Sequence, residues 1–295
     1  MRLNLKRAFL FSSAGNVDVW GRPERRRTEM MKRQFSLATR TVLGCPPPEM
    51  IYIAARAGYD FVSLRPLGMP GEPDYGFAKN EELLRQTKTA LDVTGLKLND
   101  IEGVRIMEGV VPKNYRAEME IAAELGARCV ITNVWTADRH FVLDTFSEIC
   151  DLAKPLGLIM VLEFITVSHV RNIKESLELI RTANRENVGI LVDMLHFHRS
   201  RCTLEELDSI PREYFHFAHL CDAPQEIPTT LEGMKKATFD ERLYVGEGGI
   251  DIAAILNRMP EVPCAIEIPH TERSKVLGFA EHAARCLETA KAYLW

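Results

Sequence analysis

Hydrophobic residues along this chain are grouped in eight short runs, separated by longer stretches in which apolar positions recur every three or four residues. Runs of this length predict β-strands, and the longer periodicity predicts amphipathic helices between them. Glycines follow several of the helical stretches, as expected at helix C-termini. The apolar runs begin near positions 35, 59, 96, 128, 158, 189, 215 and 264. The helical stretches cover residues 80–95, 115–127, 146–157, 173–184, 204–211 and 251–259. The glycines that follow helical stretches are Gly58, Gly95, Gly126 and Gly157.

The runs are almost continuous in Val, Ile and Leu, which is typical of strands covered on both faces in a parallel sheet. Eight strand–helix units in one chain close most simply as a (β/α)8 TIM barrel, in a single domain over residues 34–295. An open doubly wound sheet is the alternative, but no Gly-rich dinucleotide loop follows the first strand. Residues 1–33 are Arg-rich and poorly periodic, and we expect a disordered or loosely docked extension or, less simply, a targeting segment.

Composition narrows the class of protein. The net charge is −4, and Lys and Arg are mixed with acidic residues beyond residue 40, which disfavours nucleic acid as a partner. The seven cysteines are scattered and form no C-x-x-C motif, so neither a disulfide framework nor a thiolate metal site is expected. No apolar run approaches the ~20 residues that span a bilayer. We expect a cytoplasmic protein without a membrane partner, whose partner is a small molecule.

Four of the apolar runs end in residues that commonly bind metals. Glu163 lies in VLEF, Asp193 in VDMLH, His219 in HLCD and Glu267 in AIEI. A carboxylate inside a buried strand is costly unless it is paired or bound to a metal, and functional residues of such barrels project from the C-terminal ends of the strands. The pattern predicts one site for a divalent ion: Mn²⁺, Mg²⁺, Co²⁺ or Zn²⁺.

This order of motifs, with D-x-x-H in the sixth strand and H-x-x-D in the seventh, resembles the xylose isomerase-like TIM barrel superfamily, also known as the sugar phosphate isomerase/epimerase family. The resemblance spans about residues 34–295. It implies that Glu163, Asp193, His219 and Glu267 are the metal ligands and that His196 contacts the substrate. The superfamily includes sugar isomerases and epimerases, dehydratases, and apurinic endonucleases that use three zinc ions. The motifs are shared among these activities, so the resemblance specifies the fold better than the substrate.

We therefore expect a metal-dependent isomerase or epimerase of a small keto-sugar or related polyhydroxy carbonyl compound. Glu163 and Glu267 would exchange the α-proton through an enediolate, and His196 would stabilise the developing oxyanion unless it is a buried core residue. A dehydratase acting on an inosose, a keto-glycoside or a dehydroshikimate-like compound would use the same groups, and a non-catalytic sugar-binding barrel is a third possibility. An endonuclease is disfavoured because no histidine precedes His140.

Several further residues are candidates for contacts around the site. His216 competes with His219, but strand alternation places them on opposite faces, and His219 lies nearer the strand end. Asp222 would orient His219 or bind substrate. Arg65 would anchor an anionic or polyhydroxyl substrate or pair with Glu102. The Gly-rich segment 245–251 suggests a phosphate cradle, but Glu247 would place a negative charge there, and the resemblance implies a structural turn instead. The long loop 223–244 before it predicts a lid or a dimer contact in a homo-oligomer.

Overall fold

We describe a computed structural model over residues 33–67 and 72–294. The extension predicted for residues 1–33 lies, apart from Arg33, outside the described residues. Within the described part of the chain, no helix combines the length and apolarity needed to cross a membrane.

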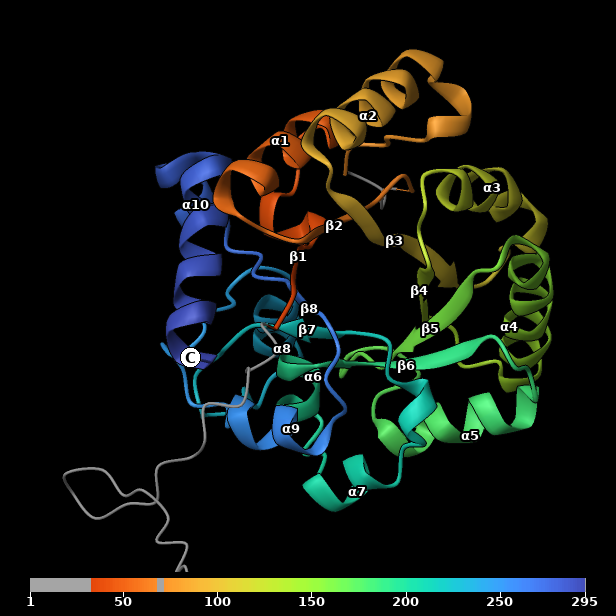
Figure 1. The fold of residues 1–295 in the computed structure, drawn as a ribbon. Coiled ribbons are helices and arrows are strands. Elements are labelled where there is room, and N and C mark those ends of the chain that lie inside the picture. Colours follow the sequence, from red (N-terminus) through yellow and green to blue (C-terminus); the bar gives the residue numbers. More distant parts are fainter. Residues whose placement is uncertain (1–32, 68–71, 295) are drawn as a thin grey trace, which may run out of the picture. The chain divides into compact units, whose positions relative to one another are not determined.

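Eight parallel strands form a closed barrel in which each strand pairs with its neighbours in sequence, and the first pairs with the last (Figure 1). This confirms the predicted (β/α)8 barrel. The strands are β1 (Phe35–Leu37), β2 (Phe61–Leu64), β3 (Lys97–Ile106), β4 (Cys129–Val134), β5 (Ile159–Glu163), β6 (Val188–Asp193), β7 (Ala218–Leu220) and β8 (Cys264–Ile266).

Helices surround the barrel. They are α1 (Pro47–Ala57), α2 (Glu81–Thr94), α3 (Arg116–Glu124), α4 (Arg139–Ala153), α5 (Ile173–Ala183), α6 (Met194–Arg199), α7 (Leu204–Asp208), α8 (Leu231–Phe239), α9 (Ile252–Arg258) and α10 (Thr271–Leu294), with short 3-10 turns at 39–42, 77–79, 112–115, 154–156 and 212–214. The helix expected over 146–157 begins earlier, at Arg139. The reason is an N-cap: the Asp138 side chain accepts hydrogen bonds from the backbone N–H groups of His140 and Phe141.

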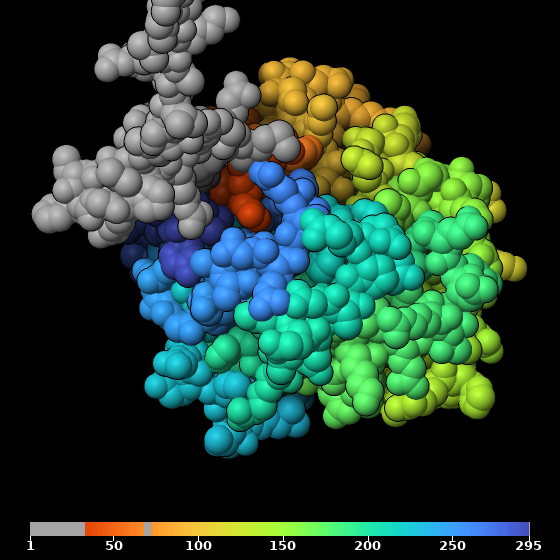
Figure 2. All heavy atoms as spheres, turned by 60° about the horizontal axis from the view of Figure 1, so that its bottom comes forward, coloured from red at the N-terminus to blue at the C-terminus, as the bar shows by residue number. Residues whose placement is uncertain are grey.

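The two ends of the barrel domain adjoin. Helix α10 packs beside α1, so the blue C-terminal residues lie next to the red and orange residues that open the barrel (Figures 1 and 2). Helix α1 begins with Pro47 in its first turn, where proline needs no hydrogen-bond partner for its nitrogen. It ends at Gly58, whose φ of 88° closes the turn.

The core has two parts. A large cluster fills the space between strands and helices. A smaller one fills the barrel interior, consisting of Ala38, Cys129, Ile131, Val161, Leu191, Phe217 and Ala265. These apolar residues exclude water from the interior of the barrel, so charged groups there depend on other protein groups or bound ligands for compensation.

Strand β3 is irregular at Gly103. Its pairing with β4 shifts between Ile101 and Val104, and Gly103 has a φ of 116°. A Cβ atom at this position would lie 2.5 Å from the carbonyl oxygen of Leu67, so only glycine fits without a rearrangement. Glu102 and Arg105 are three residues apart and would face opposite sides of a regular strand. With the bulge at Gly103, both line the same cavity.

Candidate metal centre and active site

Four neighbouring strands bring the predicted ligand residues together. Glu163 and Asp193 are the last residues of β5 and β6, His219 lies in β7, and Glu267 directly follows β8. Each residue offers one ligand atom, and these atoms all lie within 4.8 Å of one another. All four side chains are buried. The carboxyl ends of parallel barrel strands meet at one rim, which explains how residues more than 100 positions apart form one cluster.

His219 is the centre of this cluster. Its Nδ1 atom lies 3.4 Å from Glu163 Oε1, 3.4 Å from Glu267 Oε2 and 3.7 Å from Asp193 Oδ2. Burial opposes its charged form, but the three carboxylates raise the pKa of His219 well above its usual value. His216, the competing candidate, is half-buried and packs against Gly189 instead.

The donor set fits a divalent ion. Among the residues that the structure describes, neither ring nitrogen of His219 has a hydrogen-bond partner, although the side chain is only 1% exposed. Three carboxylates within 4 Å of one imidazole nitrogen repel one another and favour a cation between them. Three carboxylate oxygens and one imidazole nitrogen suit Mn²⁺, Mg²⁺, Co²⁺ or Zn²⁺, and this choice of atoms does not select among them.

Arg242 is a member of the site that the sequence analysis missed. Its Nη1 atom lies 2.6 Å from Asp193 Oδ2 and 2.7 Å from Glu267 Oε2, with the guanidinium fully buried. Burial alone would raise the pKa of both carboxyls. Arg242 instead holds the pKa of Asp193 well below its usual range and, with His219, lowers the pKa of Glu267 to about 2. Both carboxylates are therefore held ionised.

The spacing of the D-x-x-H motif has a local structural cause. Asp193 is the N-cap of α6, and its Oδ1 atom accepts a hydrogen bond from the backbone N–H of His196 at 2.9 Å. This bond leaves Oδ2 directed at His219 and Arg242. The His196 ring is buried, with Nδ1 3.4 Å from the hydroxyl of Thr166, and burial lowers its pKa. His196 does not line the cavity, so this placement favours the buried-core interpretation over substrate contact.

Asp222 holds the Gly-rich turn together. Its carboxylate accepts hydrogen bonds from the backbone N–H groups of Ala223, Gly246, Gly248 and Ile250, at 2.8 to 3.2 Å. It does not line the cavity, so the structure does not support the expected contact with substrate. The predicted structural role of the turn agrees with these contacts.

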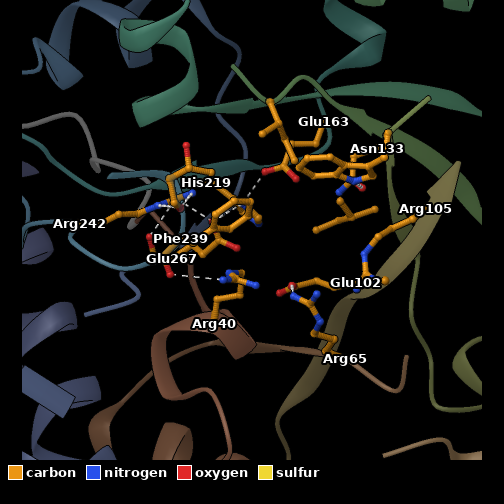
Figure 3. Close-up of a pocket in the computed structure, with 15 residues that line it drawn as sticks. Arg40, Arg65, Glu102, Arg105, Asn133, Glu163, His219, Phe239, Arg242 and Glu267 are labelled. Atoms are coloured by element: carbon orange, nitrogen blue, oxygen red, sulfur yellow. Dashed lines mark hydrogen bonds and ion pairs between the residues drawn. The ribbon is translucent and has the colours of Figure 1, made fainter. Parts of the chain in front are cut away.

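A small cavity of about 40 Å³ opens beside the cluster, and Glu163, His219, Arg242 and Glu267 line it (Figure 3). Helix α8, within the long loop after β7, contributes Phe239 to the wall. The Phe239 ring lies 6.3 Å from the ring of Trp135 and 5.5 Å from the guanidinium of Arg40. The loop therefore reaches the cavity, as expected of a covering segment.

Arg65 lines the same cavity and pairs with Glu102, as one of the two alternatives drawn from the sequence expected, while its contact with a substrate stays a prediction. Its Nη1 atom lies 3.3 Å from Glu102 Oε2, and its Nη2 atom lies 3.2 Å from Glu72 Oε2.

Comparison with known proteins agrees with this geometry. A family profile described as "Xylose isomerase-like TIM barrel" matches residues 51–289. The chain belongs to this family. It is similar to the inosose isomerases of Bacillus subtilis (25% identity over 60% of this chain and 65% of the relative) and Bacillus velezensis (24% over 79% and 85%). The alignment thus spans just under two thirds of the B. subtilis relative. The crystal structure of the IOLI protein with a bound zinc atom shares the fold, with a TM-score of 0.75, 19% identity and coverage of 88% of this chain and 98% of that one.

In this xylose isomerase-like barrel, the three cavity arginines missed by sequence analysis lie in a short turn, in a loop or beside an irregular strand position. Arg40 follows β1, Arg105 follows the bulge in β3, and Arg242 lies three residues before the Gly-rich segment 245–251. The glycine inside the apolar strand run, Gly103, was the one available sign of a bulge.

Proposed function

We propose that this protein is a divalent-metal-dependent isomerase or epimerase of a small keto-sugar or related polyhydroxy carbonyl compound. The observation that carries the proposal is the set of four ligand atoms within 4.8 Å of one another, three of whose residues line a cavity. The similarity to inosose isomerases and the zinc bound by the structurally related IOLI protein support it. The ion itself is left as one of Mn²⁺, Mg²⁺, Co²⁺ or Zn²⁺.

Glu163, Asp193, His219 and Glu267 would hold the ion. When bound, a divalent ion would polarise the substrate carbonyl and lower the pKa of the adjacent carbon-bound proton. Asp193 is suited to binding the ion but not to proton transfer, because its Oδ1 atom accepts a hydrogen bond from the first turn of α6 and its Oδ2 atom accepts one from Arg242.

Glu163 and Glu267 are the proposed acid and base, and their surroundings differ. Glu267 is paired with Arg242, and with its pKa lowered to about 2 it is a weak base. Among the described residues, no Lys or Arg lies within ion-pair distance of Glu163, which also lines the cavity. We therefore assign removal of the α-proton to Glu163 and its return, on the same or the opposite face, to either glutamate.

Among the proposed substrate contacts, Arg65 is the best supported because it lines the cavity. His196 and Asp222 act in this proposal as positioning residues, through the N-terminal turn of α6 and the Gly-rich turn respectively.

The test is proton NMR of the metal-loaded protein in deuterium oxide with a panel of keto-sugars, inososes and keto acids. Deuterium incorporation at the α-carbon with an intact carbon skeleton is the expected result. Incorporation with loss of a hydroxyl group would instead establish a dehydratase, which uses the same base. No exchange with any compound, in protein shown to hold its metal, would contradict the proposal.

A further inference from the structure

Three arginines besides Arg242 line the same cavity. Arg40 follows β1, Arg65 follows β2 and Arg105 lies in β3, so they come from three adjacent strands. In Figure 3, Arg65 and Arg105 lie on either side of Glu102, away from Arg242, and Arg40 lies between Arg242 and Glu102. One small cavity therefore holds a second group of charges beside the metal-ligand cluster.

The carboxylates near these arginines are too few to pair with all of them. Glu72 lies 3.2 Å from both Arg40 Nη1 and Arg65 Nη2, and Glu102 Oε2 lies 3.3 Å from Arg65 Nη1. Within the described part of the chain, no carboxylate lies within ion-pair distance of Arg105. Two acidic side chains thus face three guanidinium groups.

Two buried donor atoms are left without an acceptor. Arg105 Nη2 and Arg65 Nε are inaccessible to solvent and have no hydrogen-bond partner among the described residues. Arg65 as a whole is only 7% exposed. Buried polar groups in folded proteins nearly always have partners, so unused N–H groups at a cavity wall indicate the place of a ligand acceptor.

The electrostatics of the cavity agree with this geometry. Burial, with the neighbouring charge of Arg65, lowers the pKa of Arg105 to about 10. Burial also raises the pKa of Glu102 to about 7 despite Arg65, so Glu102 carries less than its full negative charge near neutral pH. The raised pKa of Glu102 leaves positive charge in excess on this side of the cavity, and the lowered pKa of Arg105 indicates that its cation is only partly compensated by the protein.

The backbone is shaped to present Arg105. In a regular strand, Glu102 and Arg105 would point to opposite faces, and the bulge at Gly103 brings both to the cavity wall. A residue with a Cβ atom at Gly103 would collide with the Leu67 carbonyl. The bulge therefore requires glycine.

We propose that the substrate of this site carries a carboxylate or phosphate group, which Arg105 binds with Arg65 and Arg40 while the reacting carbons face the metal-ligand cluster. Guanidinium groups bind both oxyanions through paired N–H donors, whereas a neutral hydroxyl uses neither the charge nor the paired geometry. The position of the reacting carbons near the metal-ligand cluster rests on the proposed function, whereas the binding of the anionic group does not.

The first test compares three forms of each candidate substrate that differ at one terminal carbon: the neutral alcohol, the carboxylic acid and the phosphate ester. Deuterium exchange measures kcat/KM for the wild type, Arg105→Met, Arg105→Lys and the exposed control Arg116→Met. We expect the wild type to prefer one anionic form by at least about 100-fold. Arg105→Met should lose that preference, Arg105→Lys should keep part of it, and Arg116→Met should keep all of it. Whichever anion is preferred identifies the group.

The second test needs no turnover. Calorimetric titration of metal-loaded protein with inorganic phosphate and with acetate should give binding of at least one that weakens at least tenfold in Arg105→Met. Because the metal ion is present in both proteins, the difference in anion affinity between them measures the contribution of Arg105. Binding that depends on Arg105 without exchange of any substrate would contradict the proposed function and leave the anion site standing. Exchange of neutral sugars with equal or higher kcat/KM, or anion binding unchanged in Arg105→Met, would overturn the anion site and leave the proposed function standing.

Discussion

Replacing Arg242 with methionine tests whether this arginine balances the charge of the ligand cluster. The substitution keeps a long apolar side chain but removes a cation 2.6 Å from Asp193 and 2.7 Å from Glu267. All three side chains are at most 3% exposed. Removing one partner from a buried ion pair costs about 3–5 kcal/mol, because the remaining charge is left without compensation. We expect a loss of unfolding free energy in this range in the metal-free protein.

A bound divalent ion should reduce this loss because it would neutralise the same two carboxylates. The assay is urea unfolding followed by circular dichroism, with a chelator and with saturating metal. A matched control is Arg116→Met, which removes an ion pair of similar length, 2.7 Å to Glu120, between side chains that are 64% and 47% exposed. Exposed helix pairs contribute about 0.3–0.5 kcal/mol, so the control should change little in either condition.

Two outcomes would refute this reasoning. If Arg242→Met is destabilised no more than Arg116→Met, the buried carboxylates do not depend on the arginine. If the loss is equal with and without metal, the ion and the arginine do not act on the same carboxylates.

Three further predictions concern the ligand cluster and the barrel interior. Glu163→Gln should lower kcat for deuterium exchange at least 100-fold while the circular dichroism spectrum stays unchanged. Glu267→Gln should lower kcat by a similar factor and should also reduce the metal content. Near-normal turnover in Glu163→Gln would show that Glu163 is not the base. His219→Ala should lose most bound metal by elemental analysis while His216→Ala keeps it, and the reverse would exchange their roles. Burial raises the pKa of Asp100 from 3.8 to about 6, so the folded protein retains a proton that the unfolded chain releases. The free energy of unfolding should therefore fall as pH rises from about 4 to 6, by up to about 3 kcal/mol at 1.36 kcal/mol per pKa unit. Urea unfolding at pH 4 and pH 7 should show a smaller fall in Asp100→Asn than in the wild type. An unchanged pH dependence in this variant would show that Asp100 is not the group responsible.

The barrel could be predicted from the sequence because its determinants are local. Each of the eight apolar runs contains a strand, and the caps and glycines mark where most helices end. The long β3 was the exception: the run was expected to end near Val104, but the strand continues to Ile106 through the bulge. A bulge depends on the neighbouring strand and on Leu67, which periodicity within one segment does not include.

The residues of the candidate site also differ in whether the sequence alone could identify them. Glu163, Asp193, His219 and Glu267 could be selected from the sequence because each is a polar residue at or just beyond the end of a buried strand, and the barrel brings such ends together. Asp222 lies at a similar strand end, but its carboxylate binds backbone N–H groups of a turn 24 to 28 residues further along the chain. Only the path of that loop decides which of these acids faces the cavity.

The sequence by itself determined the strands, their order and the carboxylate and histidine residues at the strand ends. These features follow from the pattern of apolar runs along the chain. The tertiary structure alone decided most of the charges near them: Arg242 between Asp193 and Glu267, and Arg40 and Arg105 at the wall of the cavity that also holds the Arg65–Glu102 pair. Arginine side chains are long, and their ion-pair partners here lie up to 49 residues away in sequence. Their contacts depend on how loops return over the barrel, which no local pattern of polar and apolar residues specifies.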